Sequence, residues 1–284
     1  MTEDAFARTY GVELLCESSP NIEKAALLEA VKRYCPDAKL LDPNPATPLL
    51  ALVHPKHHVR LADAVVPAQT LIAQADKPLK RETCEQALNQ TWEFADARAK
   101  VEISTTSVLV TDVMSSSLEY RQRLALFHDC LRGVLDYVPC AAIHWRPSGR
   151  IVDPSAWRRD YDAGDPAQRF FAGAVNVRLF NVQNEAGKSP GELVMDTLGL
   201  AALGLVDLQC HFQGLDPGDV ARVLYNTAWY LFCEGDVIAD GHTVQGVRAG
   251  SKWRCQHEKS LVGPERVVLD LNPGPAHATG SRAN

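Results

Sequence analysis

Histidines are densest in the segment His54-Pro55-Lys56-His57-His58, where several imidazoles could bind a metal ion. A zinc ion needs side chains that converge to about 2 Å from it. His57 and His58 are adjacent and therefore diverge in an extended segment, and His54 would need a turn at Pro55 to reach one of them. We interpret the segment as an exposed polar turn, with a metal site at His54, His57 and His58 as the alternative.

A second set of polar side chains, Asp207, Gln209 and His211, alternates with the apolar residues Val206, Leu208, Cys210 and Phe212. This period of two predicts a half-buried strand. Cys210 and His211 then point to opposite faces and cannot act as a nucleophile and its base. We expect the face with Asp207, Gln209 and His211 to be solvated, and keep a binding surface on it as the alternative.

Sequence motifs for catalysis and for nucleotide binding are missing from the chain. It has no Gly-x-Ser-x-Gly, no cysteine framed by glycines and no glycine-rich phosphate loop, and we predict no cofactor. A hydrolase would therefore need a site assembled across the fold. The first candidates for such a site are His211 with Asp207, and His144 beside Trp145.

Composition sets the class of protein to which these residues belong. The 284 residues are 46% hydrophobic, and 29 Lys+Arg against 35 Asp+Glu give a net charge of −6. We find no basic cluster for nucleic acid and no run of about 20 apolar residues for a membrane span. The acidic start Met1–Glu13 is unlike a secretion signal, so we predict a cytoplasmic protein, whose eight cysteines are reduced and in the core.

The elements expected in the first half suggest a duplicated unit. Strands are predicted at Tyr10–Glu17, Ile103–Thr111 and Cys140–Trp145, and helices from Pro20 to Cys35, over Lys80–Lys100 and over Leu118–Tyr137. Two of the helices end in Tyr-x-Pro, at Tyr34 and at Tyr137. We therefore predict an α+β fold with ferredoxin-like β-α-β units and a mostly antiparallel sheet.

The second half predicts a helix-strand-helix-hairpin unit. Ser189-Pro190-Gly191-Glu192 has the layout of a capping box for a helix that ends at Gly204. The strand Val206–Phe212 follows, then a helix from Asp216-Pro217 to Gly235, and a hairpin at Asp240-Gly241. We place the domains at 1–150 and 151–272, followed by a flexible tail over 273–284.

The run Met195–Gln209, with Gly214–Pro217 and Gly235–Gly241 after it, resembles the bacterial family named domain of unknown function 4261. A looser likeness extends over Val59–Gly246. The family has no agreed activity, so the resemblance implies a bacterial α+β protein and no catalytic residue. Related proteins are expected near genes for type VI secretion and polymorphic toxins, which implies a neutralising or adaptor role.

Together these observations favour a non-enzymatic protein-binding module, an immunity protein or secretion accessory whose partner is a toxin or a secretion component. An acidic protein is steered toward basic surfaces, which agrees with the net charge of −6. The alternative is the hydrolase assembled across the fold.

Overall fold

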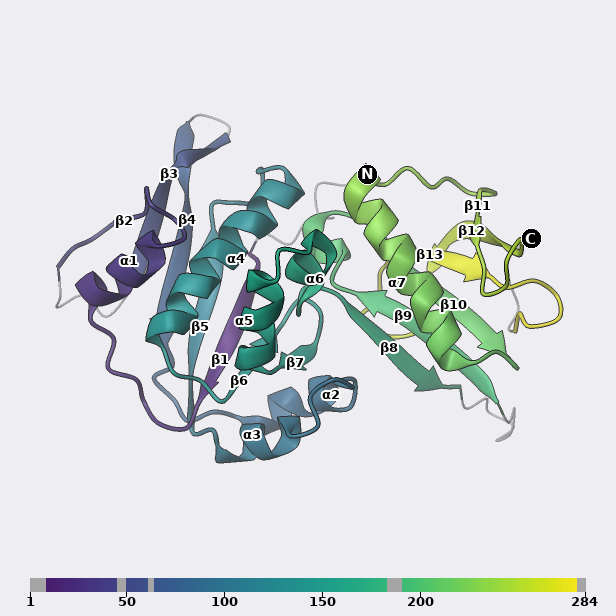
Figure 1. Ribbon diagram of the computed structural model, residues 1–284, viewed down its shortest axis with the longest axis horizontal. Helices are drawn as coiled ribbons and strands as arrows, with labels where there is room; N and C mark the ends of the chain where they lie inside the picture. Colours follow the sequence, from purple (N-terminus) through teal and green to yellow (C-terminus); the bar gives the residue numbers. More distant parts are fainter. Residues whose placement is uncertain (1–8, 45–49, 61–63, 183–190, 280–284) are drawn as a thin grey trace. The chain divides into compact units, whose positions relative to one another are not determined.

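Strand β1 (Gly11–Cys16) lies inside the first of two sheets because its side chains are nearly all apolar and buried. The computed structural model describes residues 9–44, 50–60, 64–182 and 191–279, and the chain divides into two units at Ala174 and Val175 (Figure 1). In the first unit the strand order is β2-β3-β4-β5-β1-β6-β7, and all pairs are antiparallel. The other strands are Lys39–Leu40 (β2), Leu50–Arg60 (β3), Val65–Gln74 (β4), Thr106–Val113 (β5), Ala142–Trp145 (β6) and Arg150–Val152 (β7).

Two interleaved β-α-β units form the centre of this sheet. One runs from β1 through α1 to β4, with β2 and β3 inserted between α1 and β4, and the other runs from β5 through α4 to β6. The order β4-β5-β1-β6 is therefore the predicted ferredoxin-like arrangement. The α+β class is thereby confirmed. In Figure 1, α1, α4 and α5 lie across one face of the sheet. The helical segments of the unit are Lys24–Lys32 (α1), Arg81–Cys84 (η2), Glu85–Leu88 (α2), Ala97–Ile103 (α3), Tyr120–Tyr137 (α4), Pro154–Asp162 (α5) and Pro166–Phe171 (α6).

Helices α1 and α4 approach so closely that one position between them has no space for a side chain. A Cβ atom on Gly133 would lie 2.5 Å from the Cα atom of Val31 and 2.9 Å from the carbonyl oxygen of Ala30. Glycine therefore allows the two helices to pack backbone against backbone.

We expect Gly133→Ala to lower the free energy of unfolding, because separating α1 from α4 costs about 1–3 kcal/mol. Because the close atoms belong to the backbone, we expect the upper part of this range, which exceeds the roughly 1 kcal/mol that alanine gains over glycine in helix propensity. Urea unfolding measures the difference. A midpoint equal to or above that of the wild type would contradict the close approach.

The predicted helix Lys80–Lys100 is wrong, because the segment divides into η2, α2 and α3. The hydroxyl of Thr91 donates to the carbonyl of Ala87 (2.8 Å) and accepts from the amide of Ile151 (3.0 Å), which ends α2 and attaches it to β7. The pieces then cover an apolar cluster of the first unit. It comprises Leu15, Cys84, Ala87, Ala97, Val101, Ala142 and Ile151.

The second unit contains one sheet with the helix α7 across it (Figure 1). The strand order is β11-β12-β13-β10-β9-β8, in which β10 and β13 are parallel and the other pairs antiparallel. Helix α7 begins as predicted, since the carboxylate of Asp216 accepts from the amide of Asp219 (3.1 Å). The elements are Asn176–Asn181 (β8), Glu192–Leu198 (β9), Ala201–Leu203 (η3), Asp207–Gln213 (β10), Pro217–Glu234 (α7), Thr243–Gln245 (β11), Lys252–Lys259 (β12) and Val267–Asn272 (β13).

Two predictions for this unit are wrong. Residues expected to form a helix up to Gly204 form β9 and η3 instead, because pairing with both β8 and β10 satisfies the backbone of β9. Ser189 and Pro190 lie outside the described residues. The predicted hairpin at Asp240-Gly241 is the second error. A turn is present there, but the residues before it form no strand, and β11 after it pairs with β12 instead. The amide of Gly241 and the carbonyl of His242 both bind the backbone of Cys255 on β12.

The boundaries of the two units differ from the domain boundaries predicted from the sequence. The first unit extends to Ala174 and includes α5 and α6, whereas the sequence placed the boundary at 150. In the expected tail, Ala278 bridges to Phe212, and the carbonyl of His277 accepts from the amide of Gln213 (2.9 Å). No helix among the described residues is both long enough and apolar enough to span a bilayer.

Candidate functional site

The structure buries the polar residues that the sequence placed on a solvated face of β10. Asp207 and Gln209 have no exposed surface and His211 is 8% exposed, so the prediction of solvation is wrong. The apolar residues on the other side of β10 are buried too. A segment over residues 260–266 contributes to this burial, because the amide of Leu261 donates to the Gln209 side chain (2.7 Å).

Asp207 belongs to a buried network of four charged side chains. The guanidinium of Arg266 donates to Asp207 (3.0 Å) and to Asp196 on β9 (2.8 Å). Arg178 on β8 donates to both carboxylate oxygens of Asp196, at 2.9 and 2.5 Å. Burial raises the pKa of Asp207, and the nearby Arg266 opposes this effect.

This network holds the segment 260–266 against the sheet. Arg178 on β8 donates to the carbonyl of Gly263 in the segment (2.9 Å), and Arg266 in the segment donates to Asp207 and Asp196 on the sheet. Asp207 also accepts from the amide of Leu200 (3.1 Å). Every charge therefore has a partner of opposite sign within the unit, and we assign the network a structural role.

The hydrolase candidate His211 lies next to a different carboxylate from the one proposed. Its Nε2 atom is 2.8 Å from Oε1 of Glu192, while the oxygens of Asp207 accept from Arg266, Thr197 and Leu200. The structure therefore brings Glu192 to His211. The sequence indicated Glu192 only as part of a helix capping box, and gave no sign that it lies beside His211.

The second hydrolase candidate, His144 on β6, is buried in a polar cluster of the first unit. Its Nδ1 atom is 3.9 Å from the sulfur of Cys84 and 3.8 Å from Oε2 of Glu13. Glu13 also accepts from Ser107 (2.6 Å) and Arg146 (2.6 Å). Cys84 is fully buried and burial raises the pKa of its thiol, so a reactive thiolate is disfavoured in this fold.

The histidine segment is part of β3 and not an exposed turn. His54 is buried and contacts the hydroxyl of Thr70 through Nε2 (2.9 Å). The register between β3 and β4 shifts between His54 and His58, so a bulge separates the two side chains. Within the described ranges, no group of three potential ligands is arranged to hold a metal ion.

All eight cysteines are free thiols, in agreement with the prediction of reduced cysteines. Cys140 and Cys233 are partly exposed and the other six are buried in the core.

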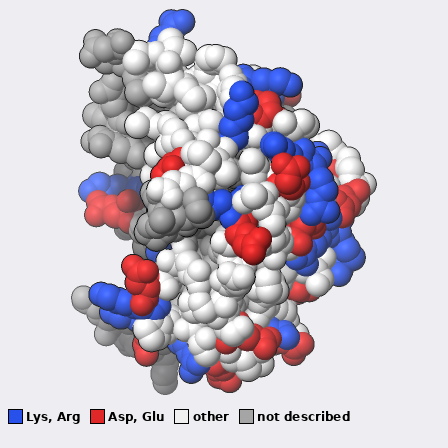
Figure 2. Space-filling view, turned by 90° about the vertical axis from the view of Figure 1, so that its left-hand side faces the viewer, with Lys and Arg blue, Asp and Glu red and all other residues white. Residues whose placement is uncertain are grey.

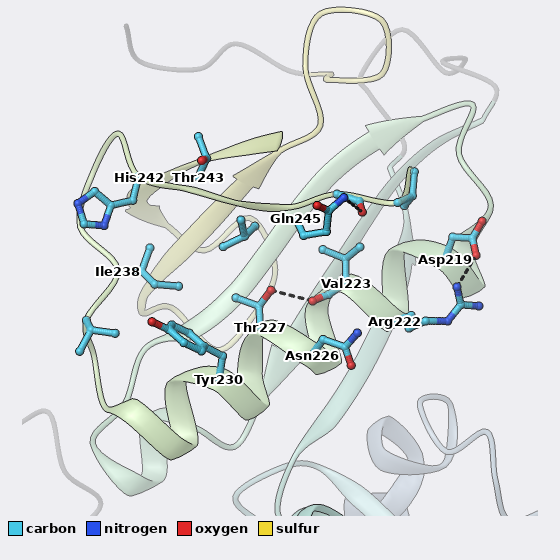
Figure 3. Close-up of a pocket in the computed structure, with 14 residues that line it drawn as sticks. Asp219, Arg222, Val223, Asn226, Thr227, Tyr230, Ile238, His242, Thr243 and Gln245 are labelled. Carbon is cyan, nitrogen blue, oxygen red and sulfur yellow. Dashed lines mark hydrogen bonds and ion pairs between the residues drawn. The ribbon is translucent and has the colours of Figure 1, made fainter. Parts of the chain in front are cut away.

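An open groove lies in the second unit between α7 and the segment 236–247 (Figure 3). Its volume is about 440 Å³. One wall is formed by Arg222, Asn226 and Tyr230, which are four residues apart and therefore share a side of α7. The opposite wall is the segment that contains β11, with His242, Thr243 and Gln245 labelled in Figure 3. The remaining lining residues are Asp219, Val223, Thr227, Val237, Ile238, Val244, Gly246 and Val247.

Several polar groups of this groove make bonds within their own segments. The Thr227 hydroxyl donates to the carbonyl of Val223 (2.8 Å), and Arg222 is 3.0 Å from Asp219. Apolar surface is exposed between them, since Tyr230 is 50% and Val237 48% accessible. A concave apolar surface rimmed by hydrogen-bonding side chains is typical of a binding site.

Comparison with known families bears on the second unit. Residues 196–272 match the model of a domain of unknown function (DUF4261). Comparisons with curated proteins and with solved structures gave no match. The matched residues include Asp196, Asp207 and Arg266 of the buried network and the whole lining of the groove. The chain therefore carries, over residues 196–272, a region that resembles the DUF4261 family.

Proposed function

We propose that the chain is a cytoplasmic, non-enzymatic module that binds a protein partner through the groove between α7 and the segment 236–247. The observation that carries this proposal is the groove itself, where Tyr230 and Val237 are accessible beside hydrogen-bonding side chains. Tyrosine is among the residues that contribute most to affinity at protein interfaces. The Thr227 hydroxyl and the His242 imidazole bind neighbouring backbone, which suits recognition better than catalysis.

Charge supports a protein partner over a nucleic acid. The face of the molecule in Figure 2 shows Lys and Arg side chains interspersed with Asp and Glu. In the first unit, Arg132 pairs with both Asp136 and Asp162. The net charge of −6 favours a partner with a basic surface. The family resemblance suggests a toxin or a secretion component, for which the chain would be an immunity or accessory protein.

We expect a photoreactive phenylalanine analogue at position 230 to cross-link one protein in extracts of the source cells. The same analogue at position 225 is the matched control, because Tyr225 is also exposed on α7 but does not line the groove. Mass spectrometry of the two reactions identifies proteins specific to position 230. Equal cross-linking from both positions would contradict a partner in the groove.

The identified partner then allows a quantitative test. Tyr230→Ala is expected to weaken its binding by at least about tenfold, since a central tyrosine contributes roughly 2 kcal/mol. Tyr225→Ala should leave the affinity within about twofold. Both variants should retain the thermal midpoint of the wild type, because both side chains are on the surface.

A further inference from the structure

We infer that the partner occupies this groove as an extended segment that adds a strand to the open edge of β11 and places an apolar side chain, flanked by basic ones, beside Tyr230. This inference rests on the proposed function. It specifies the conformation and the chemistry of the occupant.

Strand β11 ends the sheet order within the described part of the chain, so one of its edges is paired with β12 and the other is open. The amide of Gly246 donates to the carbonyl of Ser251, and the carbonyl of His242 accepts from the amide of Cys255. Hydrogen bonding alternates along an antiparallel pair. The backbone amides and carbonyls of Thr243 and Gln245 therefore point away from β12, toward the open edge.

The open edge borders the groove. Thr243 and Gln245 both line it, and α7 forms the opposite wall (Figure 3). An extended segment between the two walls would bond to the backbone of β11 while its alternate side chains contact α7. An approaching helix could not use these backbone groups, because its own are already paired.

The surroundings of Tyr230 determine the chemistry of the occupant. Tyr230 and Val237 are accessible and the buried Ile238 also lines the groove, so this end accepts an apolar side chain. Glu234 and Asp236 are exposed next to it, and the sequence has no lysine or arginine from position 223 to position 247. Lysine or arginine beside the apolar residue would be attracted to these carboxylates.

The test begins with a displayed library of random linear peptides, selected on the full chain. Peptides that Tyr230→Ala no longer binds are synthesised with a fluorescent label, and their affinities are measured by anisotropy. We expect an apolar residue flanked by lysine or arginine. The charge variant Glu234→Gln with Asp236→Asn should weaken binding several-fold, most at low ionic strength.

Strand addition is tested with Gln245→Pro, which removes an amide from the open edge and leaves the pairing with β12 intact. Gln245→Ala is the matched control, since it removes the side chain and keeps the amide. We expect proline to weaken peptide binding at least about tenfold more than alanine, with both variants folded by circular dichroism.

The outcomes separate the two proposals. Suppose that Tyr230→Ala weakens binding of the natural partner, while Gln245→Pro and Gln245→Ala bind it with equal affinity. The groove is then used without strand addition, and the inference is overturned. A library that yields no peptide dependent on Tyr230, or only acidic ones, overturns it as well. If Tyr230→Ala has no effect on the natural partner, the proposed function itself fails.

Discussion

Lowering the pH from about 7 to about 5 is expected to reduce the free energy of unfolding of the first unit by about 4 kcal/mol. Burial lowers the pKa of His128 to about 3, with the charge of Arg169 adding to the effect. Burial also lowers the pKa of His54 to about 4. Both imidazoles have an ordinary pKa of 6.5, which they regain on unfolding.

The sign follows from proton binding. Between pH 6.5 and the folded pKa values, the unfolded chain binds protons that the folded chain does not, so stability falls as the pH drops below 6.5. Each histidine loses about 2 kcal/mol at a pH of about 5. His144, whose pKa burial also lowers, adds to the loss, whereas the raised pKa of Asp207 acts in the opposite direction in the second unit.

His128 should account for much of the effect, because aromatic rings enclose it. Its ring centroid lies 5.3 Å from that of Trp145, 5.5 Å from Trp157 and 6.1 Å from Phe170. Urea unfolding at a series of pH values measures how the free energy of unfolding changes with pH. His128→Phe should remove about half of the acid-dependent loss, whereas exposed His58→Gln should leave it unchanged. A wild-type curve that is flat between about pH 7 and 5 would show that these histidines are not desolvated.

Removing Asp196 is expected to destabilise the second unit by about 3–5 kcal/mol. Asp196→Ala leaves the guanidinium of Arg178 buried without its carboxylate, and takes one of the two carboxylates from Arg266. The exposed fractions of the Asp196 and Arg178 side chains are 0% and 3%, so water cannot replace the lost partner. The cost is therefore that of an unpaired charge in the core.

A solvent-exposed ion pair of the same unit provides the control. Lys259 and Glu265 are 85% and 80% exposed, and Glu265→Ala should cost less than about 1 kcal/mol. Denaturant unfolding of both variants, followed by circular dichroism, gives the comparison. If Asp196→Ala cost no more than Glu265→Ala, the four-charge network would not hold the segment 260–266.

Local patterns predicted the elements whose sequence signal is long or specific. The helix α4, the cap of α7 at Asp216-Pro217 and the strand β10 were each predicted within a few residues, because periodicity and capping act between neighbours. The shorter apolar run of β9 was assigned to a helix. A short apolar run is compatible with a helix or a strand, and here the pairing with β8 and β10 makes it a strand.

The sequence alone determined the α+β class, the pair of β-α-β units and the resemblance to the DUF4261 family, since these depend on composition, period and local motif; of the looser likeness over Val59–Gly246, the family model matches residues from 196 onward. The tertiary structure alone decided the candidate site. Asp196 and Arg266 are 70 positions apart, and the walls of the groove are brought together by the turn after α7 and the pairing of β11 with β12. A polar face on a strand is solvated or buried according to what packs on it. Here the segment 260–266, which includes Arg266, packs on that face and is held by Arg178, and the spacing of residues along the chain does not indicate such distant contacts.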